Sequence, residues 1–300
     1  MNLAPIFQNQ FEGKVLFQEP LSKHTTIRVG GPADVMICPK NTKDVIKAIR
    51  LAKENQLPLK VIGRGSNLLV CDEGIRGVVL KISDCMDEIC ISGNEVMVGA
   101  GYSFIKLATQ LSKKGFDGLT FASGIPGSVG GAVYMNAGAH KNEIAQIVKK
   151  VQVLDEDGHC HWLTSEEMQF QYRTSILQTK PSLFCLQVIL QLQKGNKEQI
   201  MKEIEKNKTY RKTTQPWDYP NCGSVFRNPL PKYAGQLIEQ AGLKGFCIGK
   251  AMVSEKHANF IVNIGGATAK DIFDLISYIQ DKIFSLYQIQ LKTEVEVIKK

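Results

Sequence analysis

The sequence predicts a protein of the α+β class, in which helices and strands are mixed along the chain and more than one domain is present. Three observations support this prediction. The chain has 300 residues, more than one hydrophobic core usually organises. It is 43% apolar and 22% charged, as expected for a globular protein. Segments with a helical spacing of apolar residues alternate with short apolar runs that are typical of strands.

The first part of the chain is expected to form an α/β unit. Residues 42–56 carry apolar side chains on one helical stripe, and Asn41 or Thr42 can cap the start of this helix. Short buried strands are expected at 59–63 and 77–82, since both segments are small runs of mostly aliphatic residues.

The middle of the chain is expected to be a strand-rich α+β unit that ends near the polar segment 194–198. Its expected elements are a strand over 95–101, a helix over 103–115, a hairpin over 151–163 with Asp-Gly in the turn, and a strand over 183–193. The last third is expected to contain helices at 197–212, 233–241 and 269–287 and a terminal strand within 291–299.

The charge is uneven. Of the net charge of +8, +5 lies between Lys202 and Lys256, where ten basic residues face five acidic ones. This window is either a solvated basic surface or a site for a phosphorylated or carboxylated ligand. No sequence signature of a nucleic-acid-binding fold accompanies the charge, so we expect no nucleic acid partner.

The chain has no run of roughly 20 apolar residues, and its N-terminus lacks the features of a secretory signal. We therefore expect no membrane association and a cytoplasmic location. The eight cysteines include no CxxC pair, which argues against a zinc ribbon. His159-Cys160-His161 is the one ligand-like cluster, but neighbouring strand residues point to opposite faces, so we expect no metal there.

Three glycine-rich turns are candidates for binding a cofactor. They are 63–69, 99–101 and 123–138, and so many small residues let the backbone approach a flat or anionic ligand closely. Each turn alone fits an ordinary tight turn about as well, but together they favour one extended cofactor. The chain contains neither G-x-G-x-x-G nor a P-loop motif, so Rossmann and P-loop folds are not expected.

Six segments, in order, make the chain similar to a known family. They are 24–33 (HTTIRVGGPA), 63–70 (GRGSNLLV), 123–139 (SGIPGSVGGAVYMNAGA), 172–173 (YR), 223–229 (GSVFRNP) and 291–297 (LKTEVEV). The set resembles the UDP-N-acetylenolpyruvoylglucosamine reductase family, whose members are vanillyl-alcohol-oxidase-like FAD proteins. The resemblance implies non-covalent FAD, NADPH as co-substrate, and reduction of the enolpyruvyl ether of UDP-N-acetylglucosamine to UDP-N-acetylmuramate for peptidoglycan. It also implies three domains: 1–82 with 290–300 and 83–195 for FAD, and 196–289 for the UDP-sugar.

The resemblance also assigns roles to residues. Ser224 matches the proton donor, Arg173 the arginine at the enolpyruvyl carboxylate, and Glu294 the acid near the C-terminus. The substrate-binding candidates are Asn228, Lys212, Tyr233, His257 and Asn259. The cofactor-binding candidates are Gly63, Arg64, Gly65, Ser66, Asn67, Leu68, Gly99, Gly101, Ser123, Gly124, Ile125, Pro126, Gly127, Ser128, Gly130, Gly131, Ala132, Asn136, Ala137 and Gly138.

Two other functions compete with this interpretation. One is a different FAD oxidoreductase of the same fold that acts on a sugar or a hydroxy acid. The other, based on the charge alone, is a non-catalytic module that binds phosphorylated ligands or RNA. We expect a monomer or a weak oligomer in either enzymatic case.

Overall fold

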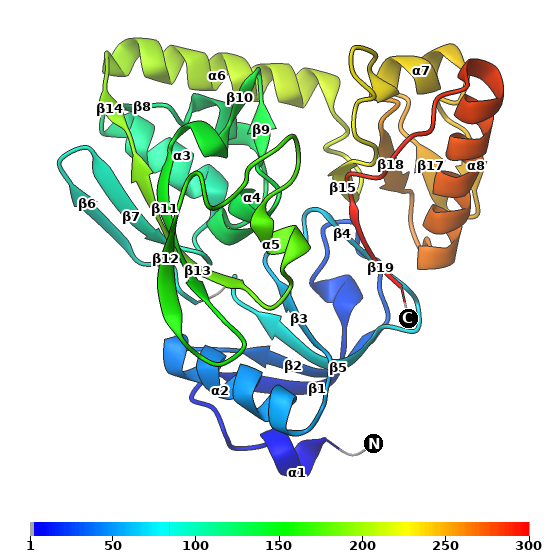
Figure 1. Cartoon of the computed structure of the whole chain (residues 1–300). Coiled ribbons are helices and arrows are strands. Elements are labelled where there is room, and N and C mark those ends of the chain that lie inside the picture. Colours follow the sequence, from blue (N-terminus) through cyan, green and yellow to red (C-terminus); the bar gives the residue numbers. More distant parts are fainter. Residues whose placement is uncertain (1–2, 84, 300) are drawn as a thin grey trace. The chain divides into compact units, whose positions relative to one another are not determined.

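The computed structural model describes residues 3–83 and 85–299, and the chain divides into two compact units. Unit 1 contains Met1–Phe17, Asp34–Arg64 and Gly77–Tyr210, and unit 2 contains Gln18–Ala33, Gly65–Arg76 and Arg211–Lys300. Each unit has its own hydrophobic core, and the chain passes between the units several times. The expected mixture of helices and strands is confirmed (Figure 1). The predicted three-domain boundaries stay a prediction.

The N-terminal part of the structure is a four-stranded sheet in the order β1-β2-β5-β3. Its strands are β1 (Lys14–Pro20), β2 (Pro32–Cys38), β5 (Ile75–Lys81) and β3 (Leu59–Ile62), and β3 and β5 are parallel. Helix α2 (Thr42–Glu54) lies along this sheet and buries Val45, Ala48 and Ala52 (Figure 1). The side chain of Asn41 accepts a hydrogen bond from Asp44 N at 3.0 Å, so the predicted helix start is confirmed. A short helix, α1 (Ala4–Phe7), precedes the sheet.

The larger sheet of unit 1 is antiparallel and has five strands in the order β12-β11-β13-β7-β6. They are β12 (Cys160–Thr164), β11 (Val148–Leu154), β13 (Phe184–Gln191), β7 (Glu95–Gly99) and β6 (Ile89–Ser92). The predicted hairpin is confirmed by the pairing of β11 with β12.

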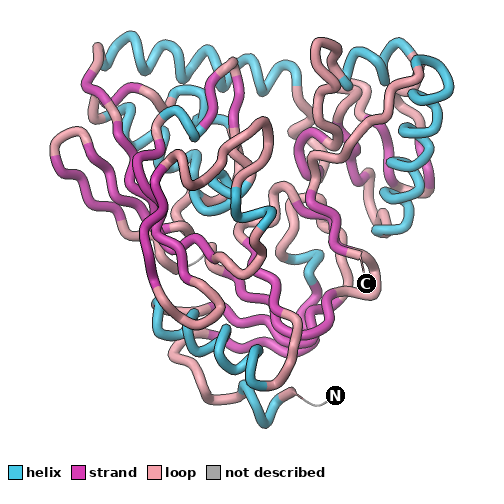
Figure 2. The backbone as a smooth tube through the Cα atoms, in the orientation of Figure 1, coloured by secondary structure: helices cyan, strands magenta, loops and turns pink. Residues whose placement is uncertain are grey.

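Short helices and strand pairs complete unit 1 (Figure 2). They are α3 (Phe104–Lys113), η2 (Thr120–Gly124), α4 (Val129–Tyr134), η3 (Ile144–Gln146) and α5 (Ile176–Thr179), with the pairs β8 (Phe116–Asp117)–β14 (Gln193–Lys194) and β9 (Gly138–Ala139)–β10 (Asn142–Glu143). The predicted helix before Gly115 is confirmed, and Gly115 adopts φ +75° directly after its end.

Unit 2 contains an antiparallel sheet in the order β15-β18-β17-β16. Its strands are β15 (Asn221–Ser224), β18 (Phe260–Asn263), β17 (Ala251–Val253) and β16 (Cys247–Ile248). Helices α7 (Ala234–Gln240) and α8 (Ala269–Tyr287) have the predicted positions, and α8 packs on β16 and β17. Asp72 accepts hydrogen bonds from Ala269 N and Lys270 N, which ties the start of α8 to the segment after β4.

The remaining elements are η1 (Leu21–Lys23), the pair β4 (Leu68–Val70) and β19 (Glu296–Ile298), and helix α6 (Lys197–Thr214). Strand β19 confirms the predicted terminal strand and pairs in parallel with β4, directly after the glycine turn at 63–67. Helix α6 confirms the predicted basic helix and buries Ile200 and Ile204. Over residues 3–83 and 85–299, no helix is both long and apolar enough to cross a bilayer.

Candidate active site

Ser224 and Glu294 lie 70 residues apart in the sequence, and unit 2 brings their backbones together. Ser224 ends β15 and pairs with Phe260 of β18. The next residue, Val225, accepts a hydrogen bond from Glu294 N at 2.7 Å, and Arg227 N donates to Lys292 O at 2.9 Å. The segment 224–227 is therefore held between β18 on one side and 292–294 on the other.

The turn that follows β3 is joined to this pair. The side chain of Asn67 donates to Glu294 O at 3.1 Å, and Asn67 O accepts from Glu296 N at 3.0 Å. Thr26 donates its hydroxyl proton to Asn221 O at 2.7 Å and its backbone N–H to Gly65 O at 3.1 Å. Residues from four of the six segments that carry the family resemblance thus meet around Ser224 in unit 2.

Local backbone chemistry explains why this turn forms. Gly65 has φ +64°, and a Cβ atom there would lie 2.0 Å from His24 O, so only glycine fits. Gly223 has φ +79° immediately before Ser224, and its N–H donates to the Asn221 side chain at 3.1 Å. The Ser224 side chain is half-buried, and its hydroxyl makes no hydrogen bond to any residue that the structure describes.

A buried asparagine fixes the strand that carries Ser224. The Asn259 amide accepts from Phe226 N at 3.0 Å and donates to Phe226 O at 2.8 Å. Asn259 O also accepts from Val225 N at 2.8 Å. Asn259 and Phe226 are 4% and 1% exposed, so these bonds lie away from water.

Arg173 lies in unit 1, on a tight loop after β12. Gln171 and Thr174 exchange two backbone hydrogen bonds of 3.0 Å, and Arg173 between them has φ +58°. The guanidinium donates to Gly138 O at 2.9 Å and to Asn136 O at 3.5 Å, and it lies 5.0 Å from the centre of the Tyr172 ring. The loop is thereby tied to the segment 136–138.

The glycine turns of unit 1 lie against one another. A Cβ atom on Gly63 would lie 2.4 Å from the Ser128 hydroxyl oxygen, and one on Gly130 would lie 2.9 Å from Ala100 Cβ. Gly130 N donates to Ala100 O at 2.8 Å. Small residues from each of the three glycine-rich turns therefore meet in unit 1. Such residues are what close approach of a flat cofactor such as FAD requires.

The cofactor candidates fall into two groups. Those in unit 1 are Gly63, Arg64, Gly99, Gly101, Ser123, Gly124, Ile125, Pro126, Gly127, Ser128, Gly130, Gly131, Ala132, Asn136, Ala137 and Gly138, and those in unit 2 are Gly65, Ser66, Asn67 and Leu68. Arg64 donates to Ser83 O at 3.2 Å, and Ser123 donates its hydroxyl proton to Thr120 O at 2.8 Å. Ser128 caps α4 by accepting from Gly131 N.

Three of the substrate-binding candidates surround the start of α7. Asn228 accepts from Ala234 N at 3.1 Å, and the Tyr233 side chain is 53% exposed. His257 Nδ1 accepts from Asn259 N at 3.2 Å, and its ring packs edge-on against Phe260 at 4.9 Å. Burial is the main cause that lowers the pKa of His257 below its usual range. The accepted hydrogen bond and the lowered pKa both favour a neutral imidazole with its proton on Nε2.

The basic end of α6 supplies the remaining substrate-binding candidate. Lys212 is exposed, and its carbonyl accepts from Lys256 Nζ at 2.8 Å. Burial lowers the pKa of neighbouring Arg211 to about 10, so its guanidinium is still charged at neutral pH. Trp217 Nε1 donates to Arg211 O at 3.0 Å. This end of the helix therefore presents cations in unit 2, as the charge pattern predicts.

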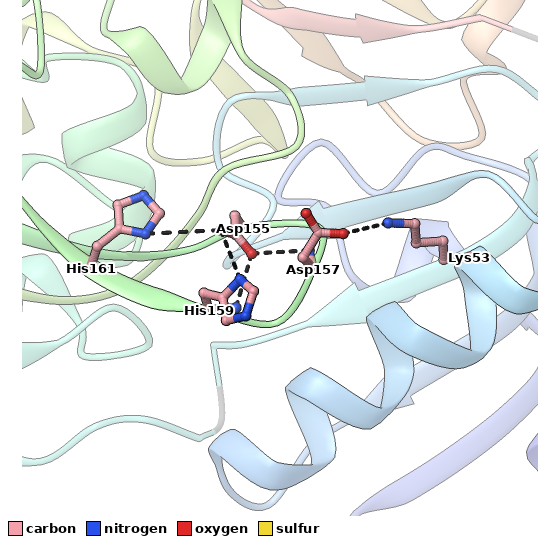
Figure 3. Close-up of polar contacts among 5 residues, drawn as sticks. All are labelled: Lys53, Asp155, Asp157, His159 and His161. Carbon is pink, nitrogen blue, oxygen red and sulfur yellow. Dashed lines mark hydrogen bonds and ion pairs between the residues drawn. The ribbon is translucent and has the colours of Figure 1, made fainter.

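The tip of the β11–β12 hairpin gathers four titratable side chains (Figure 3). His159 Nδ1 and His161 Nδ1 lie 3.7 and 4.0 Å from the same carboxylate oxygen of Asp155. His159 and His161 therefore approach one carboxylate, although neighbouring strand residues point to opposite faces. Lys53 Nζ lies 2.6 Å from Asp157 Oδ1, so a cation already neutralises one of the carboxylates. Backbone N–H groups of His159 and Asp157 lower the pKa of Asp155.

Gln178 was not singled out from the sequence. Its side chain donates to Arg173 O at 3.0 Å and to Tyr134 O at 2.7 Å. The contact with Tyr134 has no local sequence pattern that would reveal it, because Tyr134 lies 44 residues earlier.

Two family models match the chain. The model described as the UDP-N-acetylenolpyruvoylglucosamine reductase C-terminal domain matches residues 215–298, and the model described as an FAD binding domain matches residues 33–164. The first match covers Ser224 and Glu294, and the second covers the three glycine turns.

Curated relatives and a solved structure agree with these matches. UDP-N-acetylenolpyruvoylglucosamine reductase from Anoxybacillus flavithermus is 56% identical over 95% of this chain and 95% of its own length. The Bacillus subtilis enzyme of the same name is 54% identical over 95% of this chain and 94% of its own length. The crystal structure of the Thermus caldophilus reductase has a TM-score of 0.83 at 35% identity and covers 96% of this chain and 99% of that chain.

Proposed function

Because the chain belongs to the UDP-N-acetylenolpyruvoylglucosamine reductase family, we propose that Ser224, Arg173 and Glu294 carry the chemistry of substrate reduction. The chain is an FAD-dependent oxidoreductase that reduces UDP-N-acetylglucosamine enolpyruvate to UDP-N-acetylmuramate with NADPH, in the synthesis of peptidoglycan precursors. The relatives favour this activity over that of another FAD oxidoreductase and over a non-catalytic binding module.

Arg173 binds the enolpyruvyl carboxylate. An enol ether is electron-rich and resists hydride, so the carboxylate next to the double bond has to become electron-withdrawing. A guanidinium pairs with a carboxylate through two parallel hydrogen bonds and stabilises the negative charge that develops on it. FAD, when bound, would supply at its N5 the hydride that originates from NADPH, and this chain's own residues would hold and activate the substrate.

Ser224 gives its hydroxyl proton to the other carbon of the double bond. A serine hydroxyl is a weak acid, so its contribution depends on being held at the right place. Its freedom from hydrogen bonds with the described residues leaves the hydroxyl available for a substrate. Glu294 acts on the same substrate end and, when its carboxyl group is protonated, donates to a carboxylate oxygen.

The observation that carries this proposal is the hydrogen bond of 2.7 Å from Glu294 N to Val225 O. Because Val225 directly follows Ser224, this bond brings the main chain of Glu294 next to the strand end that carries Ser224, although the two assigned residues are far apart in the sequence. The Asn67 side chain supports the assignment further, because it joins the turn expected at the cofactor to the main chain of Glu294.

The other site assignments belong to the same proposal. The cofactor candidates of the glycine-rich turns bind FAD. Asn228, Tyr233, His257 and Lys212 bind the UDP-sugar, with the cations of the α6 end next to the diphosphate. The three-domain division, a cytoplasmic location and a monomeric or weakly oligomeric state complete the proposal.

The test separates the two halves of the reaction. In Ser224→Ala, NADPH should still bleach the flavin absorbance at the normal rate, whereas reoxidation by the enolpyruvyl sugar should slow by about 10²- to 10⁴-fold, the usual contribution of a positioned general acid. Stopped-flow absorbance measures both steps. Ser277→Ala is the matched control, because Ser277 is exposed on α8 of the same unit. Fast reoxidation in Ser224→Ala would exclude Ser224 as the proton donor.

A further inference from the structure

Asn136 lies at the centre of the contacts that hold the Arg173 loop. Its side chain is 0% exposed. The amide nitrogen donates to Gln171 O at 3.0 Å, and the amide oxygen accepts from Ala145 N at 3.2 Å. Its own carbonyl oxygen lies 3.5 Å from Arg173 Nη1. One residue therefore binds both the first residue of the loop and the guanidinium that the loop presents.

Both polar atoms of the Asn136 amide are used in these main-chain contacts. A buried amide that is hydrogen-bonded at both ends stabilises one local geometry, because leaving either partner unpaired costs about 1–3 kcal/mol. The contacts join three separate segments: 136–138, the loop 171–174 and the turn at 144–146. The amide is therefore committed to the protein rather than turned toward a ligand.

Two further side chains, those of Ser175 and Gln178, also hold the Arg173 loop in place. Ser175 donates its hydroxyl proton to Tyr134 O at 2.8 Å, and Gln178 donates to both Tyr134 O and Arg173 O. Arg173 has φ +58°, a backbone conformation that costs a residue with a Cβ about 1–2 kcal/mol. Such a loop keeps its shape only because its surroundings specify it.

We propose that Asn136 is a positioning residue for Arg173. Its side-chain amide sets the position of Gln171, and its main-chain carbonyl sets the direction of the guanidinium. Arg173 can then meet the substrate carboxylate with two N–H groups at once. This inference rests on the proposed role of Arg173. It gives Asn136 a role different from the flavin contact that the family resemblance implied.

The substitution Asn136→Gly tests the side chain without straining the backbone. Asn136 has φ +42°, which glycine adopts freely, so the change removes the amide and keeps the turn. We expect normal flavin reduction by NADPH and reoxidation by the enolpyruvyl sugar slowed by about 10- to 100-fold, the usual effect of a misplaced reactive group. The matched control is Asn142→Gly, because Asn142 is exposed on β10, close to Asn136 in the sequence, and its side chain donates to His140 O.

A double-mutant cycle with Arg173→Ala distinguishes positioning from direct flavin binding. If Asn136 acts through Arg173, Asn136→Gly should add nothing to the slow reoxidation of Arg173→Ala. If it binds the flavin, the two effects should multiply and FAD should dissociate more readily. Multiplying effects, or equal slowing of both half-reactions in Asn136→Gly, would overturn the inference.

Two further results keep this test decisive. If Arg173→Ala alone reoxidises at the normal rate, the proposed function of Arg173 has failed rather than the inference about Asn136. If Asn136→Gly does not fold, Gln178→Ala is used instead to test whether the loop positions Arg173. The change removes the partly buried side chain that donates to Arg173 O. It should slow reoxidation without slowing reduction, and an equal effect on both would count against a positioned loop.

Discussion

Ser224 and Arg173 are held in their two units by different kinds of contact. In unit 2, Ser224 sits on a strand whose neighbours are bound through main-chain groups, with Val225 and Arg227 bonded to 292–294. In unit 1, Arg173 sits on an irregular loop that is fixed mostly by side chains of Asn136, Ser175 and Gln178. A main-chain ladder can be built by many sequences, whereas a loop held by side chains depends on individual residues. Single substitutions should therefore disturb the arginine more selectively than the serine.

Among the variants that test this difference between the two units, Arg173→Lys should have the largest effect on the rate of reoxidation. The change keeps the positive charge but replaces a planar fork with a point charge, so the paired contact with a carboxylate is lost. Reoxidation by the enolpyruvyl sugar should fall by about 10²- to 10³-fold, as when one donor to a developing oxyanion is removed. Reduction by NADPH should be unaffected.

The control for this variant is Arg50→Lys, which changes an exposed arginine of α2 that pairs with Glu54. Stopped-flow reoxidation of the reduced enzyme, over a range of sugar concentrations, separates weaker binding from slower chemistry. Near-normal reoxidation by Arg173→Lys would mean that charge alone is sufficient and that the rigid loop has no catalytic purpose.

An intermediate effect, on stability rather than on rate, is expected from Asn259→Ala. The change leaves Phe226 N and Phe226 O without their buried partners, at a cost of about 2–6 kcal/mol for the two groups. The bonds from Glu294 N and Arg227 N stay, so Ser224 should remain in place. Urea unfolding should show the loss of stability, whereas the ratio of the two half-reaction rates should change little.

This variant contrasts directly with Asn136→Gly. Asn136→Gly also leaves two groups, Gln171 O and Ala145 N, without their partners and should lose stability too, but we expect it alone to change the ratio of the two half-reaction rates. If Asn259→Ala slows reoxidation as selectively as Asn136→Gly does, the main-chain contacts do not hold Ser224 by themselves. The proposed difference between the two units would then be wrong.

The sequence predicted those helices and strands whose signals, such as apolar spacing and caps, lie within or next to the element itself. Helix α8 runs over the predicted 269–287, because its apolar spacing and the Thr268 cap lie within the helix itself or next to it. The terminal strand was predicted as an element, but its pairing with β4 depends on residues more than 200 positions away. The family motifs identified Ser224, Arg173 and Glu294 as residue types in a known order.

What the sequence could not show is how these residues are held. Asn136 and Gln171 are 35 positions apart, and nothing in either segment marks the other as a partner. The same holds for Asn259 and Phe226, whose amide contacts replace part of a sheet ladder. His159 and His161 show a different limit. Both lie near Asp155, and comparing the directions of neighbouring strand residues does not reveal this contact.

The smallest expected effect is a dependence of stability on pH that comes from His257. Burial lowers its pKa, so below the ordinary histidine pKa of about 6.5 the unfolded chain binds a proton more readily than the folded one. The stability from the neutral imidazole is therefore complete above that pH and is lost as the pH falls toward the pKa of the folded protein.

His257→Gln tests this, because a glutamine oxygen can still accept from Asn259 N but does not titrate at these pH values. Urea midpoints at pH 7.5 and pH 5.5 should differ less in His257→Gln than in the unmodified protein. His161→Gln is the control, since His161 is exposed on the hairpin of unit 1, and it should leave the difference unchanged. An unchanged pH dependence of the urea midpoint in His257→Gln would show that another group titrates. The neutral imidazole of His257 would then contribute nothing to the stability near the start of α7.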